Sequence, residues 1–278
     1  MRCLVLGGTG RIGSTLLSAC FQRGLPHLGT YYRRYNPNCE PLDLFDGDSL
    51  NAMVGDYQPD TVFCAASSGV DNVIVTAKAN GSKLVYFSGD GLFGESRVAQ
   101  REDDPLKPIG ELAEKQAAEE RAIRAELPTA HLIVRTSRVY GGEHRSEPVR
   151  FIRKTLAKGQ TWAADTARFS MPTYAPDLAE VTLDLLKHGH TGTFHVVGPE
   201  RHTDFSFARM IAHVHDLDAD LIEPLLEEGE SRPTQVWLDR FKVRSLFGTN
   251  ALRSVGSALR MMRDEQFQLQ PLRAARAA

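Results

Sequence analysis

The chain has 278 residues, of which 42% are hydrophobic and 24% charged, a composition typical of a soluble globular protein with one large or two coupled domains. The net charge of −2 provides no basic surface for nucleic acid or an anionic membrane. No apolar run approaches the roughly 20 residues that span a bilayer. Because the N-terminus passes directly into a predicted strand, we expect no signal peptide and a cytoplasmic location. The four cysteines form no Cys-x-x-Cys pair and the histidines lack metal-ligand spacing, so reduced thiols and no metal site are expected.

Strand and helix patterns alternate along the first half of the chain. Apolar runs predict strands at residues 3–6, 27–32, 61–65, 83–87 and 131–135, and helical patterns lie between them at 12–22, 71–79 and 111–125. A helix at 176–187 and a strand at 193–197 predict one more unit of the same sheet. This order predicts an α/β fold of the Rossmann type, with a doubly wound parallel sheet between helices.

The remaining segments predict a second, smaller part of the molecule. We expect residues 1–141 to form a dinucleotide-binding domain, to which 172–198 return, and 142–278 to form mainly a C-terminal substrate-binding lobe. Helical patterns in that lobe lie at 148–158, 205–215, 238–246 and 254–264.

The first thirteen residues carry the clearest functional signal. Gly7, Gly10 and Gly13 form a Gly-x-x-Gly-x-x-Gly turn between the first strand and the first helix. Gly7 permits the tight turn, Gly10 lets backbone N–H groups approach a phosphate, and Gly13 lets the helix pack closely on the sheet. The motif predicts a dinucleotide site at the helix N-terminus, with Thr9 and Ile12 among its contacts. A glycine turn without a ligand is the alternative.

Basic residues at the end of the second strand favour NADP over NAD. Arg33 and Arg34 stand where an acidic residue would select NAD, and Arg11 in the glycine turn could reach the same 2′-phosphate. The alternative is that these arginines form a solvated strand end. Other expected cofactor contacts follow the second and third strands: Asp43 and Leu44 at the adenine edge, and Ala65, Ala66 and Ser67 beneath the pyrophosphate and ribose.

Four later segments resemble one known family in order along the chain. They are Ser88-Gly-Asp90-Gly-Leu-Phe93, Arg135-Thr-Ser-Arg-Val-Tyr140-Gly141, the segment from Asp165 through Pro172-Thr173 to Asp177-Leu178-Ala179, and Arg232-Pro233…Leu238…Lys242. In these segments the chain resembles the extended short-chain dehydrogenase/reductases, and within them the dTDP-4-dehydrorhamnose reductase branch. The resemblance implies an NADP-binding sheet domain, Tyr140 beside the nicotinamide, and a lobe that receives a nucleotide-sugar-like substrate.

The family's catalytic Ser/Thr, Tyr and Lys are only partly present. Lys115 resembles the lysine that binds the nicotinamide ribose, but Glu111 stands at the tyrosine position four residues earlier, and no tyrosine occurs between residues 86 and 140. Gly89 replaces the threonine, while Ser88 keeps a hydroxyl one residue away. Glu111 could form a plain ion pair with Lys115, or act as acid or base in a dry pocket.

Further departures fall near the expected pocket. Only eleven residues separate Asp71 from the strand at 83, where the family has a longer segment with an asparagine, for which Asn72 and Asn80 are candidates. Met171 and Val236 stand where the family has serines, which removes two hydroxyls from the expected pocket.

Three functions therefore remain open. The first is an atypical NADP-dependent oxidoreductase acting on a nucleotide sugar or another polar carbonyl compound, with Lys115, Glu111 and Ser88 as catalytic candidates. The second is a non-catalytic NADP-binding subunit that regulates or binds a partner protein. The third is a non-redox isomerase or lyase that uses Glu111 as base. A homodimer or protein partner is left open.

Overall fold

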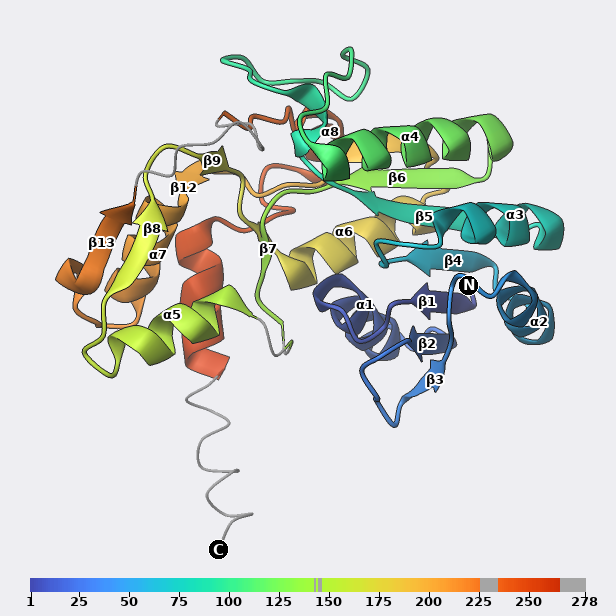
Figure 1. The fold of residues 1–278 in the computed structure, drawn as a ribbon, viewed down its shortest axis with the longest axis horizontal. Helices are drawn as coiled ribbons and strands as arrows, with labels where there is room; N and C mark the ends of the chain where they lie inside the picture. Colours follow the sequence, from blue (N-terminus) through green and yellow to red (C-terminus); the bar gives the residue numbers. More distant parts are fainter. Residues whose placement is uncertain (143, 145–146, 226–234, 266–278) are drawn as a thin grey trace, which may run out of the picture.

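The computed structural model describes residues 1–142, 144, 147–225 and 235–265. A parallel sheet with the strand order β11-β6-β5-β4-β1-β2-β3 forms the larger part of the molecule (Figure 1). Its strands are β1 (Cys3–Leu6), β2 (His27–Tyr31), β3 (Cys39–Pro41), β4 (Thr61–Cys64), β5 (Lys83–Ser88), β6 (His131–Arg135) and β11 (Gly192–His195). The predicted Rossmann-type sheet is confirmed. The strand order reverses between β1 and β4, and ligands of such sheets bind at the carboxyl edge beside that reversal.

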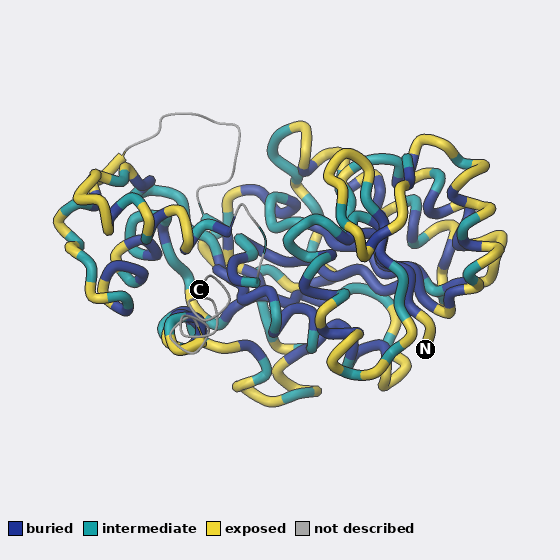
Figure 2. Tube along the Cα trace, turned by 90° about the horizontal axis from the view of Figure 1, so that it is seen from below, coloured by how far each residue is buried: buried dark blue, intermediate teal, exposed yellow. Residues whose placement is uncertain are grey.

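Helices cover both faces of the sheet because alternate residues of each strand point to opposite sides. Cys3 and Val5 of β1 pack with α1 (Arg11–Gln22) and α6 (Ala175–Lys187). Leu4 and Leu6 pack on the other side with α2 (Gly47–Tyr57), α3 (Val70–Asn80) and α4 (Glu111–Glu126). Figure 2 shows the strands buried and the outer turns of the helices exposed. Each fully buried aliphatic side chain contributes about 1.5–3 kcal/mol to such a core.

A smaller lobe follows β6. Its helices are α5 (Pro148–Leu156), α7 (Asp204–Val214) and a helix over residues 255–265, and β8 (Trp162–Asp165) pairs in parallel with β13 (Ile222–Leu225). Ile152, Phe207 and Leu259 lie in its core. Two short pairs of strands join the lobe to the sheet domain. They are β7 (Val139–Tyr140) with β10 (Thr173–Tyr174), and β9 (Phe169–Ser170) with β12 (His202–Thr203). The other elements are η1 (Gly91–Phe93), η2 (Ala219–Leu221) and α8 (Phe241–Phe247).

The elements that the sequence patterns missed are short or weakly apolar. β3 has three residues, of which only Cys39 is buried, so no strand alternation is visible. α2 buries only Leu50 and Val54, but Asp46 accepts a hydrogen bond from the backbone N–H of Ser49, which is a helix N-cap signal readable in the sequence. α8 begins at Phe241, three residues later than expected, because Leu238 and Asp239 are held in extended contacts with Gln100.

All four cysteines are free and buried, as expected for reduced structural thiols. Over the ranges that the structure describes, no helix has both the length and the apolar character needed to cross a membrane.

Candidate functional site

The glycine turn has the geometry of a phosphate cradle. Gly7 adopts φ +78°, a left-handed conformation, and its carbonyl accepts a 2.9 Å hydrogen bond from the N–H of Gly10. A methyl group on Gly13 would lie 2.2 Å from that same carbonyl oxygen, so only glycine fits. α1 begins at Arg11 with no side chain capping its N-terminus. Its first N–H groups therefore remain available to an anion, and the turn fits the pyrophosphate of a dinucleotide.

Lys115 lies across the loop that follows β4. Its ammonium donates a 2.5 Å hydrogen bond to the carbonyl of Ser67, which adjoins Ala65 and Ala66. Ala65 in turn packs on the glycine turn, since a methyl group on Gly7 would lie 3.1 Å from the Ala65 carbonyl oxygen. The structure thus brings the predicted lysine, the loop and the glycine turn together at one edge of the sheet.

A second contact sets the direction of the lysine side chain. Glu119, one turn further along α4, lies 3.7 Å from the Lys115 ammonium and accepts a 2.5 Å hydrogen bond from the Tyr86 hydroxyl. Burial, together with the neighbouring Glu119 carboxylate, raises the pKa of Tyr86, which therefore stays protonated as the donor. Lys115 is consequently held between a carbonyl and a carboxylate while its side chain stays about half exposed.

Glu111 is the first residue of α4 and is exposed. Within the described part of the chain, the i,i+4 ion pair of Lys115 is made with Glu119 and not with Glu111. Of the two alternatives for Glu111, the plain ion pair with Lys115 is therefore not formed, and the Glu111 carboxylate is not engaged by the lysine.

Ser88 does not face the cleft. It is 2% exposed and lies beside the buried pair of Glu120 and Arg135, whose two hydrogen bonds measure 2.9 and 2.7 Å. Burial alone would raise the pKa of Glu120, but Arg135 first, and then Arg124, hold that pKa below its ordinary value. The Ser88 hydroxyl is buried beside this pair without a hydrogen-bond partner in the described residues, because Ser88 shares the face of β5 that packs on α4. The expected catalytic role of Ser88 at the cleft is therefore not supported.

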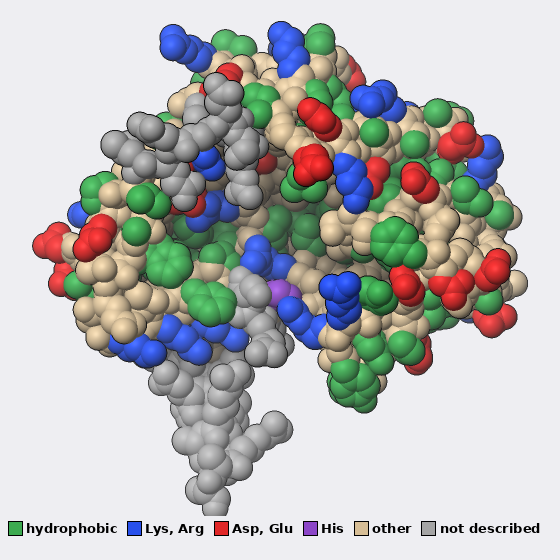
Figure 3. Space-filling model, in the orientation of Figure 1, with side chains coloured by type: hydrophobic (Ala, Val, Ile, Leu, Met, Phe, Trp, Pro, Cys, Tyr) green, Lys and Arg blue, Asp and Glu red, His purple; other side chains and the backbone are tan. Residues whose placement is uncertain are grey.

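Positive charge gathers where β2 ends. Arg33 and Arg34 are exposed; the guanidinium of Arg33 lies 5.3 Å from the Tyr32 ring centre, and Nη1 of Arg34 lies 2.6 Å from Nε2 of His144. Burial lowers the pKa of His144, and the charges of Arg34 and Arg11 lower it further. Figure 3 shows Lys and Arg side chains beside a histidine in the hollow between the two lobes. This cluster suits a phosphate group.

Arg11 points toward the second lobe. Its Nη1 donates a 2.7 Å hydrogen bond to the carbonyl of Val139 in β7, and burial lowers its pKa against the opposing effect of Glu147. The side chain therefore joins the glycine turn to the lobe. Thr9 and Ile12 lie in the same turn, half-buried.

The adenine-side loop is held in place by Asn72. Its amide donates hydrogen bonds of 2.9 and 3.2 Å to the carbonyls of Leu44 and Phe45, and Asp43 accepts one from the N–H of Phe45. Leu44 itself is buried, so Asp43 offers the more accessible side chain. Asn80, at the far end of α3, bonds to Asn51 and lies away from this edge.

Three residues near the expected pocket lie in apolar surroundings instead. Tyr140 is fully buried against Tyr174 and Phe207, so its side chain belongs to the lobe core and the expected contact with the nicotinamide is corrected. Met171 and Val236, at 2% and 6% exposure, pack together in a small apolar cluster. The sequence suggested that these two residues remove hydroxyls from an open pocket, but both side chains are buried in this cluster.

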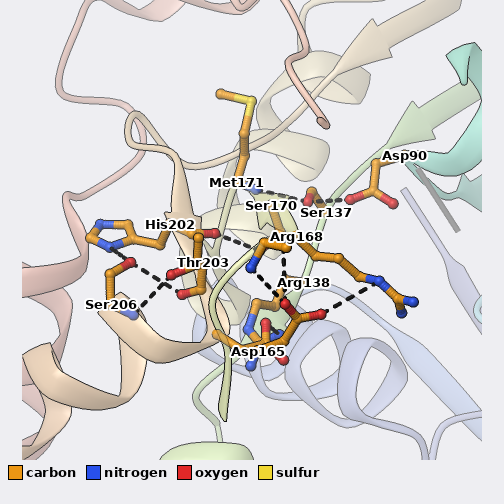
Figure 4. Close-up of polar contacts among 12 residues, drawn as sticks. Asp90, Ser137, Arg138, Asp165, Arg168, Ser170, Met171, His202, Thr203 and Ser206 are labelled. Carbon is orange, nitrogen blue, oxygen red and sulfur yellow. Dashed lines mark hydrogen bonds and ion pairs between the residues drawn. The ribbon is translucent and has the colours of Figure 1, made fainter. Parts of the chain in front are cut away.

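The sequence did not single out Ser137, which ties the sheet domain to the lobe (Figure 4). Its hydroxyl donates to Asp90, after β5, and accepts a 3.0 Å hydrogen bond from the N–H of Met171. Asp165 caps the next turn by accepting from the N–H groups of Ala167 and Arg168 at 2.7 and 3.2 Å. Ser137 lies within the Arg135–Gly141 segment, so its position in that motif was the available signal. Arg232 and Pro233 of the fourth segment lie outside the described residues.

A cavity of about 1070 Å³ lies apart from Lys115, between α1, α5, α6 and the helix at 255–265. Its lining includes Ser18, Arg150 and Arg253, but no residue of α4 or of the loop after β4. Because the glycine turn and Lys115 converge at the carboxyl edge of the sheet, we place the candidate site there and not in this cavity.

The chain is similar to proteins of one family. The family model described as the RmlD substrate binding domain matches residues 64–266. A probable low-salt glycan biosynthesis reductase, Agl14, of Haloferax volcanii is 29% identical, over 89% of this chain and 93% of its own. Methionine adenosyltransferase 2 subunit beta of Bos taurus is 26% identical, over 88% and 82%.

A solved structure shows the same fold. The dTDP-4-dehydrorhamnose reductase of Bacillus anthracis, in complex with NADP, superposes with a TM-score of 0.84 at 21% identity and covers 95% of this chain and 99% of its own. The family match spans more than half of the chain and both lobes. The chain therefore belongs to the RmlD substrate binding domain family, a sugar-nucleotide reductase-like branch of the extended short-chain dehydrogenase/reductases.

Proposed function

We propose that the protein is an NADP-dependent reductase of a carbonyl group on a nucleotide sugar or a similar polar compound. The observation that carries this proposal is the hydrogen bond from Lys115 to the Ser67 carbonyl, which puts an ammonium group beside the glycine turn. Support also comes from the relative named as a reductase and from the fold neighbour in complex with NADP.

The residues at the carboxyl edge fit the parts of NADP. The uncapped start of α1 with Gly10 would hold the pyrophosphate, Arg33 and Arg34 the 2′-phosphate, and Asp43 the adenine edge. Lys115 would bind the hydroxyls of the nicotinamide ribose. NADPH, when bound, supplies a hydride to the carbonyl carbon. The substrate would enter the hollow between the lobes (Figure 3).

The carbonyl oxygen must receive a proton as the hydride arrives, and no tyrosine stands at the usual position. Glu111 occupies that position at the exposed start of α4. We propose that Glu111 takes up this proton from water and passes it to the carbonyl oxygen. Because an ordinary carboxyl group is ionised at neutral pH, we expect this proton transfer to be slower than transfer from a tyrosine held in the site.

The test measures NADPH oxidation by absorbance with a panel of 4-keto sugar nucleotides and simpler polar ketones, alongside calorimetric titration with NADPH and NADH. We expect NADPH to bind more tightly than NADH and at least one ketone to be reduced. Lys115→Met and Glu111→Gln should lower kcat/KM by about 10²-fold or more. Tight NADPH binding without turnover of any ketone would reject the reductase.

A second candidate is a non-catalytic subunit that binds NADP and a partner protein. It is favoured by Gly89 and Glu111 at two catalytic positions and by the relative named as subunit beta of methionine adenosyltransferase 2. Cofactor binding without turnover, together with a stoichiometric enzyme partner in a pull-down, would favour it over the reductase.

A further inference from the structure

The carboxamide of Gln116 occupies the space of a missing side chain at position 89. Gln116 follows Lys115 on α4, and Gly89 follows directly after β5. A Cβ atom built on Gly89 would lie 2.7 Å from Oε1 of Gln116 and 3.4 Å from both Cδ and Nε2. The end of the Gln116 side chain therefore rests on the backbone of Gly89, where the reductases that the chain resembles carry a threonine.

The packing of α4 fixes the position of the Gln116 backbone. A methyl group on Gly91 would lie 3.2 Å from the Cβ of Ala113, so the first turns of α4 press against the backbone that follows β5. Ala113 and Ala117, on either side of Gln116 along this face, are 5% and 1% exposed. Ala117 packs with Leu92 in the apolar cluster beneath the cleft. α4 therefore cannot shift easily, and the carboxamide is presented from a rigid support.

Other polar groups near Gln116 are not available to a substrate. Ser137 donates to Asp90 and Lys115 donates to Ser67, while the Ser88 hydroxyl, which has no hydrogen-bond partner in the described residues, is buried. The Gln116 amide, which is half-buried, makes no hydrogen bond to any residue in the described ranges. It is thus an uncommitted N–H donor at this end of β5, one residue from the lysine that we assign to the cofactor ribose.

We propose that the side-chain amide of Gln116 donates a hydrogen bond to the carbonyl oxygen of the substrate, in place of the absent hydroxyl at position 89. This inference rests on the proposed reductase function. The amide stabilises the negative charge that develops on the oxygen as hydride reaches the carbonyl carbon, but its own protons stay on nitrogen. The proton that completes the alcohol comes from water through another group.

The experiment compares Gln116→Glu, which keeps the shape but removes the N–H donors, with Gln116→Ala and with the exposed neighbour Glu114→Ala as control. We expect both Gln116 variants to lower kcat by about 10²-fold, the usual loss of one such donor, with NADPH affinity unchanged. The Glu114 variant should behave as the wild type. A kcat within threefold of wild type for Gln116→Glu would overturn the proposal.

A rescue experiment tests whether the amide replaces the hydroxyl. In the Gln116→Ala background, Gly89→Thr has room for its side chain. The double variant should have a kcat at least tenfold higher than that of Gln116→Ala alone. In the wild-type background the same change must displace the flexible end of the Gln116 side chain, so its effect on kcat should differ from its effect in the Gln116→Ala background. An equal effect of Gly89→Thr on kcat in both backgrounds would contradict the contact between Gln116 and Gly89.

Ligand binding separates this proposal from the reductase function. Calorimetry would measure a 4-keto sugar nucleotide binding to the NADP⁺-loaded protein, and Gln116→Glu should weaken binding about tenfold. If the wild type shows no turnover but this loss occurs, the reductase fails and the Gln116 contact stands. If turnover occurs and neither kcat nor affinity changes in the variant, only the Gln116 proposal fails. If the wild type neither turns over nor binds the ligand, both are overturned.

Discussion

Replacement of Gly13 by alanine tests the cofactor site at its most tightly packed point. The added methyl group would lie 2.2 Å from the Gly7 carbonyl oxygen, 2.8 Å from the Gly7 carbonyl carbon and 2.9 Å from the Gly8 Cα. All three atoms belong to the backbone, so no flexible side chain can move aside. The helix and the glycine turn must separate instead.

The size of that separation sets the expected loss. Ordinary contact begins at 3.4 Å, so the start of α1 must move by about 1.2 Å from the turn. Such a shift takes N–H groups that would lie about 2.9 Å from a phosphate oxygen to beyond hydrogen-bonding distance. Losing two charge-assisted hydrogen bonds at about 1.5–3 kcal/mol each raises the Kd for NADPH by about 10²–10⁴-fold. Overpacking should also lower the free energy of unfolding by about 1–3 kcal/mol.

Calorimetric or fluorescence titration with NADPH measures the first effect, and urea unfolding the second. Gly55→Ala, within α2, is the matched control because its methyl group would meet only Oδ1 of Asn80, at an unstrained 3.9 Å. If a folded Gly13→Ala protein has a Kd for NADPH within threefold of the wild-type value, the glycine turn does not bind the pyrophosphate as proposed.

Three other substitutions test separate parts of the structure. Lys115→Met should raise the Kd for NADPH about 10- to 100-fold because it removes a charged hydrogen bond to the ribose, whereas the surface variant Lys78→Met should not; equal Kd values would contradict the assignment. Replacing Arg33 and Arg34 together by alanine should lower the preference for NADPH over NADH about tenfold or more, and an unchanged ratio in paired titrations would remove both arginines from the 2′-phosphate site. Glu120→Gln should lower the free energy of unfolding by about 3–5 kcal/mol, since it leaves a buried arginine without its counter-charge. Because the folded-state pKa of Glu120 is depressed, its contribution is present above its ordinary pKa of 4.5 and is lost as the pH falls through the lower folded value. Urea unfolding across that range should show that the free energy of unfolding depends less on pH in the variant than in the wild type. Parallel pH dependences would show that the pKa of Glu120 does not differ between the folded and unfolded states.

The sequence by itself determined the architecture of the sheet and one end of the site. The apolar runs and the Gly7–Gly13 turn are local patterns: β1, β4 and β6 are buried along their whole length, and φ at Gly7 and the contact at Gly13 admit only glycine. Lys115 was found through the resemblance of its helix to the family's lysine motif, which is also a local pattern of the sequence. The weak elements, β3 and α2, escaped because tertiary packing, and not their own pattern, holds them in place.

Only the tertiary structure decided which neighbouring groups each side chain contacts. The sequence could not show that Ser88 is buried away from the cleft, or that Tyr140 lies within the lobe core, since both depend on segments distant along the chain. It also could not show that Glu119, and not Glu111, pairs with Lys115, because both lie four residues away on the same helix. The contact between Gln116 and Gly89 has the same origin: a residue without a side chain leaves a space, and only packing between α4 and β5 determines what fills it.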